Sequence, residues 1–441
     1  MFSRWVVVLI LSVPLFILSL RTERFALLFV LPGAIFVAMG IEFLEGLWSQ
    51  FSAEHLSSLL QRVRGLGKAV FASAALIVIL PMQLLFAHAL ALKSEPIMND
   101  IWYSGMQAIR DKTPNNALIY SWWPPGYFIT SLTRRHVFSD GGTQDLPECY
   151  WLARFFMAAD ESEAIGIMRM LSASGNDAVE SLQASGLRLS EAIDVINKIL
   201  PLSKSEAVKV LNERVGPQRA SEIVKLTHEG SFAVPTNVFV YNEMIDKNLA
   251  LSVFARWNFH KAALLQRTAP KTEGLLGMFK QASKDETVRN FLASSEGILK
   301  YRPEAALEKR EGDQLFFKNG LIVDWASKTA MIQVPSEHVD GRPRSLFFLE
   351  NGALKEVPAT EKQLDMSALV YEDQGTYYSV LADRQLLLSM LYRLYYLKGV
   401  GLEYFKMIFE NLHKDSGMRV QLFQVDWDKY REQNSEKGGV L

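Results

Sequence analysis

Long apolar runs occur in the first quarter of the chain and nowhere after it. They cover residues 5–20, 25–44 and 71–92. A membrane-spanning helix needs about 20 consecutive, mostly apolar residues, so the second and third runs are long enough and the first is slightly short. Beyond residue 95, charged side chains recur every few positions. The pattern predicts a transmembrane region of about three helices in residues 1–94, followed by a large water-facing region.

The first apolar run has a second interpretation, a cleaved signal peptide, because Arg4 gives it a basic start. A signal peptide ends in a small-x-small cleavage site. No such site follows here, and the run continues instead into the charged stretch Arg21-Thr22-Glu23-Arg24. The sequence therefore favours a retained span.

Basic loop residues predict the orientation of the spans, since lysine and arginine gather on the cytoplasmic side. The longer loop, between the second and third runs, contains Arg62, Arg64 and Lys68 and is expected to face the cytoplasm. With three spans, residues 95–441 then lie on the outer side of the cytoplasmic membrane. The arginines of the short loop 21–24 favour the opposite orientation, and a functional need for them outside could override that preference.

Strand patterns occur in two parts of the water-facing region. Short apolar runs at Ala117–Trp122 and Asn237–Tyr241 are typical of buried strands. From about residue 313 the runs become more frequent, and Asn319-Gly320 and Asn351-Gly352 each separate two of them. Asn-Gly between apolar runs is a strong hairpin signal. Residues 313–441 therefore predict a β-rich C-terminal unit, which the strand MRVQLFQVDW closes.

Helical patterns lie between the early strands. Residues 148–172 have helical periodicity, and Asp160 is placed to cap a second helix that begins beside it. Residues 178–227 predict a small helical insertion, in which Ser203-Lys204-Ser205-Glu206 is a capping box. Residues 95–312 thus predict a mixed α/β extracytoplasmic domain, so the fold class is a membrane-anchored α/β protein with a β-rich C-terminal unit.

Composition and short motifs exclude several functions. The net charge of −1 gives no electrostatic basis for binding a nucleic acid. Cys149 is the only cysteine, so the extracytoplasmic region must be stable without an internal disulfide. No GxSxG, P-loop or HExxH motif is present. Asp426-Trp427-Asp428 is a DxD, which could hold a divalent metal beside a sugar phosphate, although paired carboxylates more often form solvated surface.

The stretch Trp122-Trp123-Pro124-Pro125-Gly126-Tyr127 is unusual in a water-facing region. Side chains alternate across a strand, so two adjacent tryptophans cannot both face one core and at least one ring is expected at a surface or groove. The two prolines predict an extended bend in the backbone, and the glycine permits close approach. Rigid aromatic rings could form a binding wall for a peptide or sugar. The alternative is a wedge between domains or at the membrane interface, where tryptophan is enriched.

The stretch YSWWPPGYFITSLTRRHVFSDGGTQ resembles the WWDYG region of the STT3/PglB family, the catalytic subunits of oligosaccharyltransferase. In that family an aromatic strand and then an Asp-Gly-Gly or Asp-Asn turn follow the motif, and Asp140-Gly141-Gly142 is similar to that turn. The segments ERFALLFVLPGAIFVAMG, NVFVYNEM and LADRQLLLSMLYRLYYLKGVGLEYFKMIF, the last followed by VQLFQV, resemble a late span, the strand before the second acceptor motif, and the C-terminal helix and closing strand. The resemblance covers most of the chain apart from the helical insertion.

The resemblance implies transfer of a glycan from a polyprenyl-linked pyrophosphate donor to the asparagine amide of an Asn-x-Ser/Thr acceptor polypeptide. The acceptor-binding residues that it implies are Trp122, Trp123, Gly126, Tyr127 and Met244.

For the donor pyrophosphate, the resemblance implies binding by Arg24, which precedes the late span. A guanidinium can contact phosphate oxygens through two hydrogen bonds at once. The alternative is that Arg24 only anchors a span at the interface.

Two positions depart from the family pattern on the acceptor side. The motif aspartate is replaced by Pro124, and the next position by Pro125. A proline side chain cannot accept a hydrogen bond from the acceptor hydroxyl, so the Ser/Thr rule does not carry over directly. In the second acceptor motif, Met244 fits but Lys247 stands where an aliphatic residue is expected.

The donor side departs more strongly. The catalytic carboxylates and the metal-binding DxD of the family lie on its early spans, whereas the first residues here resemble a late span. We therefore expect no catalytic residue and no ligands for the divalent metal, Mn or Mg, that the family uses. One hypothesis is the C-terminal portion of an oligosaccharyltransferase that needs a separate multi-span N-terminal subunit. The alternative is a non-catalytic, membrane-anchored protein that binds a peptide or glycan outside the cell membrane.

Overall fold

A computed structural model of the chain describes a few isolated positions before residue 98 and then residues 98–142, 148–229, 234–268, 301–360, 363–413 and 417–436. The chain divides into two units, Met1–Ile97 and Met98–Leu441. The predicted spans lie almost wholly outside the described residues, and Arg24 lies outside them as well. Among the residues that are described, no helix is both long and apolar enough to cross a membrane.

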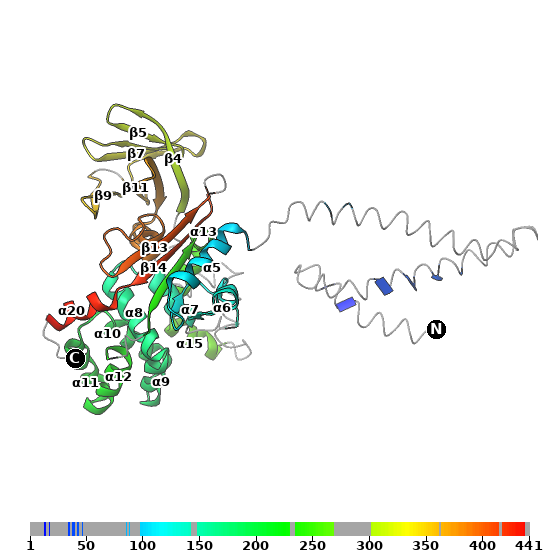
Figure 1. The fold of residues 1–441 in the computed structure, drawn as a ribbon. Coiled ribbons are helices and arrows are strands. Elements are labelled where there is room, and N and C mark those ends of the chain that lie inside the picture. Colours follow the sequence, from blue (N-terminus) through cyan, green and yellow to red (C-terminus); the bar gives the residue numbers. More distant parts are fainter. Residues whose placement is uncertain are drawn as a thin grey trace, which may run out of the picture. The chain divides into compact units, whose positions relative to one another are not determined.

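A five-stranded mixed sheet forms the α/β part of the unit Met98–Leu441, and its strands come from both ends of that unit (Figure 1). Its strand order is β13-β14-β3-β1-β2. β1 pairs in parallel with both β2 and β3, while β14 is antiparallel to β3 and β13 is antiparallel to β14. The strands are β1 (Leu118–Tyr120), β2 (His136–Val137), β3 (Thr236–Tyr241), β13 (Phe405–Leu412) and β14 (Arg419–Val425).

β3 is the central strand, and all six of its residues are buried. Helix α5 (Asp100–Lys112) packs across it: the Trp102 ring centroid lies 5.8 Å from that of Phe239 and 4.7 Å from that of Tyr241. The apolar run predicted as a buried strand is therefore confirmed. Further helices of this part are α6 (Gly126–Thr133), α7 (Glu148–Met157), α13 (Asn242–Asp246), α14 (Asn248–Ala255), α15 (Phe259–Thr268), α18 (Arg384–Leu388), α19 (Met390–Tyr395) and α20 (Trp427–Glu436).

The helical insertion lies between β2 and β3 in the sequence. Helix α8 (Glu161–Ser174) precedes the insertion. The helices of the insertion are α9 (Asp177–Ala184), α10 (Leu189–Ile199), α11 (Lys204–Val215) and α12 (Pro217–Thr227). Asp160 caps α8 by accepting from Ser162 N at 2.9 Å, and Ser203 and Glu206 form a capping box on α11. Both caps confirm the sequence-based prediction, because a cap depends on residues only two or three positions apart.

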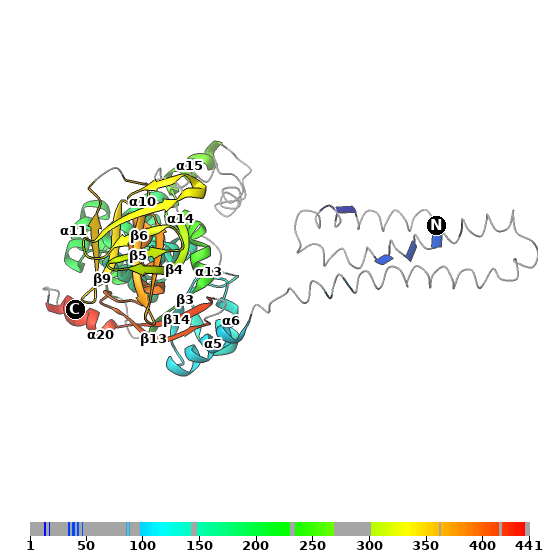
Figure 2. The same ribbon diagram turned by 90° about the horizontal axis from the view of Figure 1, so that it is seen from above.

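A nine-stranded sheet forms the β-rich part, in the order β10-β9-β11-β12-β4-β5-β6-β7-β8. Figure 2 shows β4, β5 and β6 side by side. Its strands are antiparallel except for the parallel pair β9 and β11. They are β4 (Tyr301–Glu311), β5 (Gln314–Phe317), β6 (Leu321–Asp324), β7 (Thr329–Val334), β8 (Val339–Gly341), β9 (Ser345–Glu350), β10 (Ala353–Pro358), β11 (Ser367–Asp373) and β12 (Thr376–Ala382), with a short 3-10 helix, η1 (Pro335–Glu337), before β8.

Both Asn-Gly pairs form the hairpins that the sequence predicts. Asn351 and Gly352 have φ values of 52° and 75° and connect β9 to β10. Gly320, with φ of 84°, ends the turn between β5 and β6, and its amide donates to the Phe317 carbonyl at 3.0 Å. The two-residue connection Asn351-Gly352 needs left-handed backbone at both positions, and the three-residue connection between β5 and β6 uses it at Gly320. Asparagine and glycine adopt this backbone at low cost.

Buried ion pairs connect the two sheets. Asp373, at the end of β11, accepts from Arg419 at the start of β14 at 2.7 Å and from Lys398 at 2.7 Å. Lys398 also pairs with Glu410 of β13 at 2.7 Å. The side chains of Asp373 and Arg419 are each 4% exposed. The β-rich sheet is thus attached to the α/β sheet by charges that water does not screen.

Candidate functional site at the edge of the parallel strands

Three loops meet at one edge of the five-stranded sheet. Because β1, β2 and β3 are parallel, their carboxyl ends lie at the same edge. The loops that leave this edge are residues 121–125 after β1, 138–142 after β2, and the start of α13 after β3. In open α/β sheets, ligands bind outside the carboxyl ends of the strands. This edge is therefore the candidate site.

The loop after β1 is a tight turn that leads into a helix. Gly126 N donates to the Trp123 carbonyl at 3.0 Å, and Ile129 N donates to the Pro125 carbonyl at 2.9 Å. Pro125 has φ −80° and ψ −3° and forms the N-cap of α6. The prediction of an extended bend is wrong at Pro125, and the aromatic strand implied after it is the helix α6. A fixed φ near −65° suits a helix start as well as an extended segment, so proline alone does not distinguish them.

The two tryptophans occupy different environments. Trp122 is 2% exposed and packs edge-on against Phe254 of α14, with ring centroids 5.4 Å apart. Trp123 is half-buried and packs against the same core. The preceding Ser121 Oγ donates to the Phe239 carbonyl at 2.9 Å, which ties the end of β1 to β3. Trp122 is therefore part of the core, whereas Trp123 is only partly buried.

Gly126 is required by close contact with the loop after β2. A β-carbon at Gly126 would lie 2.5 Å from Asp140 Cβ, 2.6 Å from Asp140 Cα and 2.6 Å from the Ser139 carbonyl oxygen. Backbone atoms cannot move away as the end of a side chain can. The turn after β1 and the Asp-Gly-Gly turn after β2 are thus in direct contact.

Tyr127 lies over the Asp-Gly-Gly turn and is 58% exposed. A β-carbon at Gly141 would lie 2.6 Å from Tyr127 Cε2, and one at Gly142 would lie 3.1 Å from Tyr127 Oη. Asp140 Oδ1 accepts from Gly142 N at 2.8 Å, which holds the turn. The two glycines make room for the tyrosine ring.

No protein-family model matches the sequence. The chain is 25% identical over 341 residues to the dolichyl-phosphooligosaccharide-protein glycotransferase of Methanocaldococcus jannaschii, an alignment that covers 75% of this chain and 35% of that protein. It is 34% identical over 192 residues to the protein of the same name from Methanococcus voltae, covering 42% of this chain and 21% of that protein. The chain is a relative of the STT3/PglB family. Among solved structures, the C. jejuni PglB C-terminal domain aligns with 73% of this chain and 98% of that domain, at a TM-score of 0.36 and 12% identity.

The segment that resembles the second acceptor motif starts at the same sheet edge, and its methionine is packed inward. Met244, in α13, is fully buried. Lys247 pairs with Glu243 at 3.3 Å across one helical turn, so the lysine in the aliphatic position of the STT3/PglB motif is a helix-surface residue here. The structure brings Trp122, Trp123, Gly126, Tyr127 and Met244 to one edge, with Trp123 and Tyr127 accessible at the surface.

A buried hydroxyl near this edge was not found from the sequence. Within the described part of the chain, Tyr241 Oη at the end of β3 is buried and makes no hydrogen bond. Burial raises the pKa of Tyr241 well above its usual value, and the nearby Glu243 carboxylate raises it further. The tyrosine therefore stays neutral. The sequence predicts Tyr241 only as a strand residue. That its ring packs against Trp102 of α5 is known only from the structure.

Among the residues that the structure describes, no group of three or more His, Cys, Asp or Glu side chains could hold a metal ion. Asp426 of the DxD accepts from Lys429 N at 2.9 Å at the start of α20, and Asp428 pairs with Arg431. Asp426 thus lies immediately before α20, and Asp428 lies in the first turn of that helix.

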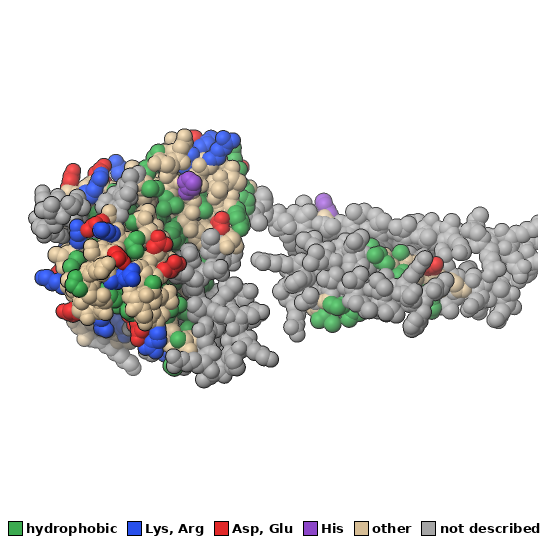
Figure 3. Space-filling view, turned by 90° about the horizontal axis from the view of Figure 1, so that it is seen from below, with side chains coloured by type: hydrophobic (Ala, Val, Ile, Leu, Met, Phe, Trp, Pro, Cys, Tyr) green, Lys and Arg blue, Asp and Glu red, His purple; other side chains and the backbone are tan. Residues whose placement is uncertain are grey.

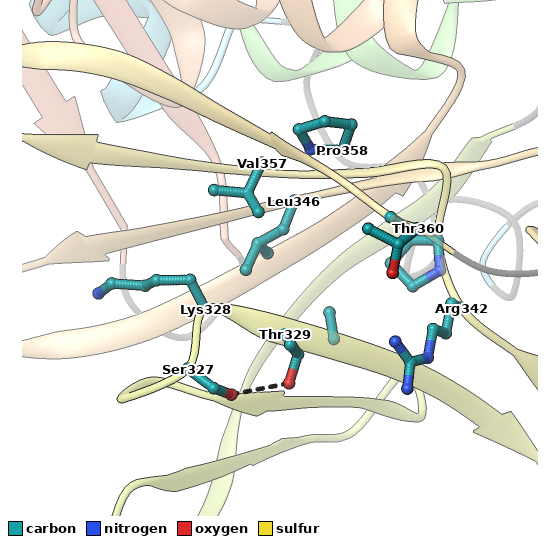
Figure 4. Close-up of a pocket in the computed structure, with 11 residues that line it drawn as sticks. Ser327, Lys328, Thr329, Arg342, Leu346, Val357, Pro358 and Thr360 are labelled. Carbon is teal, nitrogen blue, oxygen red and sulfur yellow. Dashed lines mark hydrogen bonds between the residues drawn. The ribbon is translucent and has the colours of Figure 1, made fainter.

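A separate cavity of about 140 Å³ lies in the β-rich sheet (Figure 4). Arg342 and Thr360 face each other across it, and Leu346 and Val357 form an apolar side. Its lining includes Ser327, Lys328 and Thr329 but no carboxylate. The cavity is thus separate from the three loops at the sheet edge and differs from them in chemistry.

Proposed function

We propose that residues 98–441 form the acceptor-binding part of an oligosaccharyltransferase, which transfers a glycan from a polyprenyl-pyrophosphate donor to an acceptor polypeptide. The observation that carries this proposal is the meeting of the Trp-Trp turn, the Asp-Gly-Gly turn and the start of α13 at one edge of parallel strands. Such an edge is the usual ligand site of an open α/β sheet. The names of the two relatives support the reaction class.

Trp123 and Tyr127 are proposed to contact the acceptor polypeptide. Both rings stand on backbone that is fixed: Trp123 by the turn to Gly126, and Tyr127 by the first turn of α6 over the two glycines. Rigid aromatic side chains lose little conformational entropy when a ligand binds, so they supply contact area at low cost. Trp122 and Met244, both buried, hold this surface in place.

The chemical step is assigned to residues outside the described unit. The chain spans 35% and 21% of the length of the two relatives. We propose that a separate multi-span N-terminal subunit supplies the catalytic carboxylates and the divalent metal, Mn or Mg, and that Arg24 binds the donor pyrophosphate. In this arrangement residues 1–94 form spans in the cytoplasmic membrane, and residues 95–441 lie outside the cytoplasm, where both substrates meet.

Pro124 favours one other function. Without a carboxylate at that position, the same surface could bind a peptide or a glycan in a membrane-anchored protein that catalyses nothing. The two proposals share the binding surface and differ only in whether transfer follows.

The test measures binding and transfer separately. Full-length chain, purified in detergent, is titrated with a fluorescent Asn-x-Thr peptide by fluorescence anisotropy. It is also co-expressed with a multi-span protein from the neighbouring reading frame that has an acidic first external loop, and glycan transfer to the same peptide is assayed.

We expect Trp123→Ala and Tyr127→Ala each to weaken peptide binding on the order of tenfold, as loss of an aromatic interface residue does. Trp325→Ala is the matched control, since Trp325 is also half-buried but lies between β6 and β7 of the other sheet. Wild-type chain that binds no peptide would overturn the proposal. Binding without transfer for every partner tested would support the non-catalytic function instead.

A further inference from the structure

Helix α6 carries Tyr127 in its first turn and is too short to hold its own position. It has eight residues, and its start at Pro125 has no side-chain cap. Isolated helices shorter than about 12–15 residues are only marginally stable in water. The position of α6, and with it that of the Tyr127 ring, therefore depends on contacts at the two ends of the helix.

The start of α6 is held by the loop after β2, because Gly126 lies in close contact with backbone atoms of Ser139 and Asp140. The other end is held by a buried side chain. Arg134, in left-handed backbone with φ of 58°, ends the helix, and Arg135 follows it directly before β2. Arg135 is only 6% exposed.

The Arg135 guanidinium connects the carboxyl ends of two helices. Its Nη2 donates to the carbonyl oxygens of Arg110, at 2.6 Å, and of Thr113, at 2.8 Å, at the end of α5. Its Nη1 donates to the carbonyl oxygen of Thr133, the last residue of α6, at 2.9 Å. Its Nε donates to Thr113 Oγ1 at 3.1 Å. The last carbonyls of a helix have no partner within the helix, so this one side chain satisfies the ends of α5 and α6 together.

The charge of Arg135 makes this contact hard to replace. All the acceptors of its guanidinium are neutral oxygens, and most are carbonyls at the negative ends of helix dipoles. A buried charge that loses its partners is costly. A lysine at this position would keep the charge, but its single nitrogen cannot reproduce the planar fork that contacts both helices.

We propose that Arg135 is a positioning residue for acceptor binding, which fixes the end of α6 to α5 and thereby sets the place of the Tyr127 ring at the sheet edge. The side chain acts through α6 and does not contact the acceptor, because it is buried and each of its nitrogens already donates to this chain. This inference rests on the proposed acceptor-binding function.

Arg169 provides a matched control. It is 5% exposed and also donates to carbonyls at the ends of two helices. Its Nε donates to the Thr227 carbonyl of α12 at 2.7 Å, and its Nη2 donates to the Leu200 carbonyl after α10 at 3.1 Å. The helices that Arg169 joins belong to the helical insertion, so a substitution there reports the effect of lost stability alone.

The test is a double-mutant cycle on peptide binding. Full-length chain in detergent is titrated with the fluorescent Asn-x-Thr peptide by fluorescence anisotropy, as wild type, Arg135→Lys, Tyr127→Ala and the double variant. We expect Arg135→Lys to weaken binding on the order of tenfold, about as much as loss of the Tyr127 ring. In the double variant Arg135→Lys should cause no further loss, because the contact that it displaces is already absent.

Arg169→Lys should keep the wild-type affinity, although it lowers the unfolding temperature as Arg135→Lys does, since both lose buried hydrogen bonds. Thermal unfolding checks that each variant is folded at the temperature of the titration. If Arg135→Lys does not fold, Thr113→Val takes its place in the cycle. It removes the acceptor of the Arg135 Nε bond, leaves the bonds to carbonyls in place, and should weaken binding by a smaller factor.

The outcomes are distinguishable. Wild-type chain that binds no peptide would overturn the proposed function and this inference together. If wild-type chain binds and folded Arg135→Lys, or Thr113→Val in its place, binds equally well, acceptor binding stands and the positioning role is wrong. The role is also wrong if the substitution weakens binding as much without the Tyr127 ring as with it, or if Arg169→Lys weakens binding to the same extent.

Discussion

Trp122 and Trp123 are adjacent in the chain but have different roles at the residue scale. Trp122 is buried against Phe254, while Trp123 is half-buried at the turn that begins α6. The expectation that one ring stands at a surface or groove follows from strand geometry alone. Which ring it is depends on the helix α14, which no local pattern places beside Trp122.

This difference predicts unequal effects on stability. Trp122→Ala should lower the free energy of unfolding by about 3–5 kcal/mol, because it removes a buried ring and leaves a cavity. Trp123→Ala should cost clearly less, since part of its surface is already in water. Chemical denaturation of both variants, followed by circular dichroism, tests this. Equal losses would show that Trp123 is as deeply packed as its neighbour, and it would then be a poor probe of binding.

At the scale of single elements, α12 ends in a buried histidine whose surroundings the sequence did not reveal. His228 is 5% exposed, and its ring nitrogens lie 2.8 Å from Thr227 Oγ1 and 3.2 Å from the Leu202 carbonyl oxygen. Burial, together with the nearby Arg169 guanidinium, lowers the pKa of His228 to about 3. The imidazole is therefore neutral in the folded insertion.

This pKa predicts how stability depends on pH. Between the unfolded value of about 6.5 and the folded value of about 3, the unfolded chain binds a proton that the folded chain does not. Stability contributed by His228 is thus present above pH 6.5 and is lost as pH falls towards 3, by at most about 1.4 kcal/mol per pH unit. His228→Gln should flatten this dependence in urea unfolding between pH 7 and pH 4.5. His260→Gln, at an exposed position on α15, should retain the wild-type slope.

At the scale of the whole unit, one buried ionic cluster joins the α/β sheet to the β-rich sheet. Asp373 contributes from β11, Arg419 and Glu410 from β14 and β13, and Lys398 from the loop before them. Exposed charges are different: Figure 3 shows positive and negative side chains intermixed over the face in view. Exposed pairs are screened by water and contribute little, whereas a buried charge without its partner is costly.

Removing the shared carboxylate should therefore weaken the unit as a whole. Asp373→Asn leaves Arg419 buried without its closest ion-pair partner and should lower the free energy of unfolding by about 3–5 kcal/mol. Asp111→Asn, which breaks the exposed pair with Arg110, should change it by less than about 1 kcal/mol. Urea denaturation compares the two, and similar effects of both substitutions would contradict a buried cluster.

The sequence by itself determined the local features of this protein: the buried strand β3, the caps of α8 and α11, and both Asn-Gly hairpins. Each depends on residues a few positions apart, whose preferences survive without knowledge of the fold. The helix after Pro125 was missed because proline suits a helix start as well as an extended bend. Only the tertiary structure decided that β13 and β14 return to the first sheet, that Asp373 and Arg419 meet, and that Asp140 lies against Gly126. Those contacts join residues from different elements of the fold, and strand order, rather than local pattern, sets which of them touch.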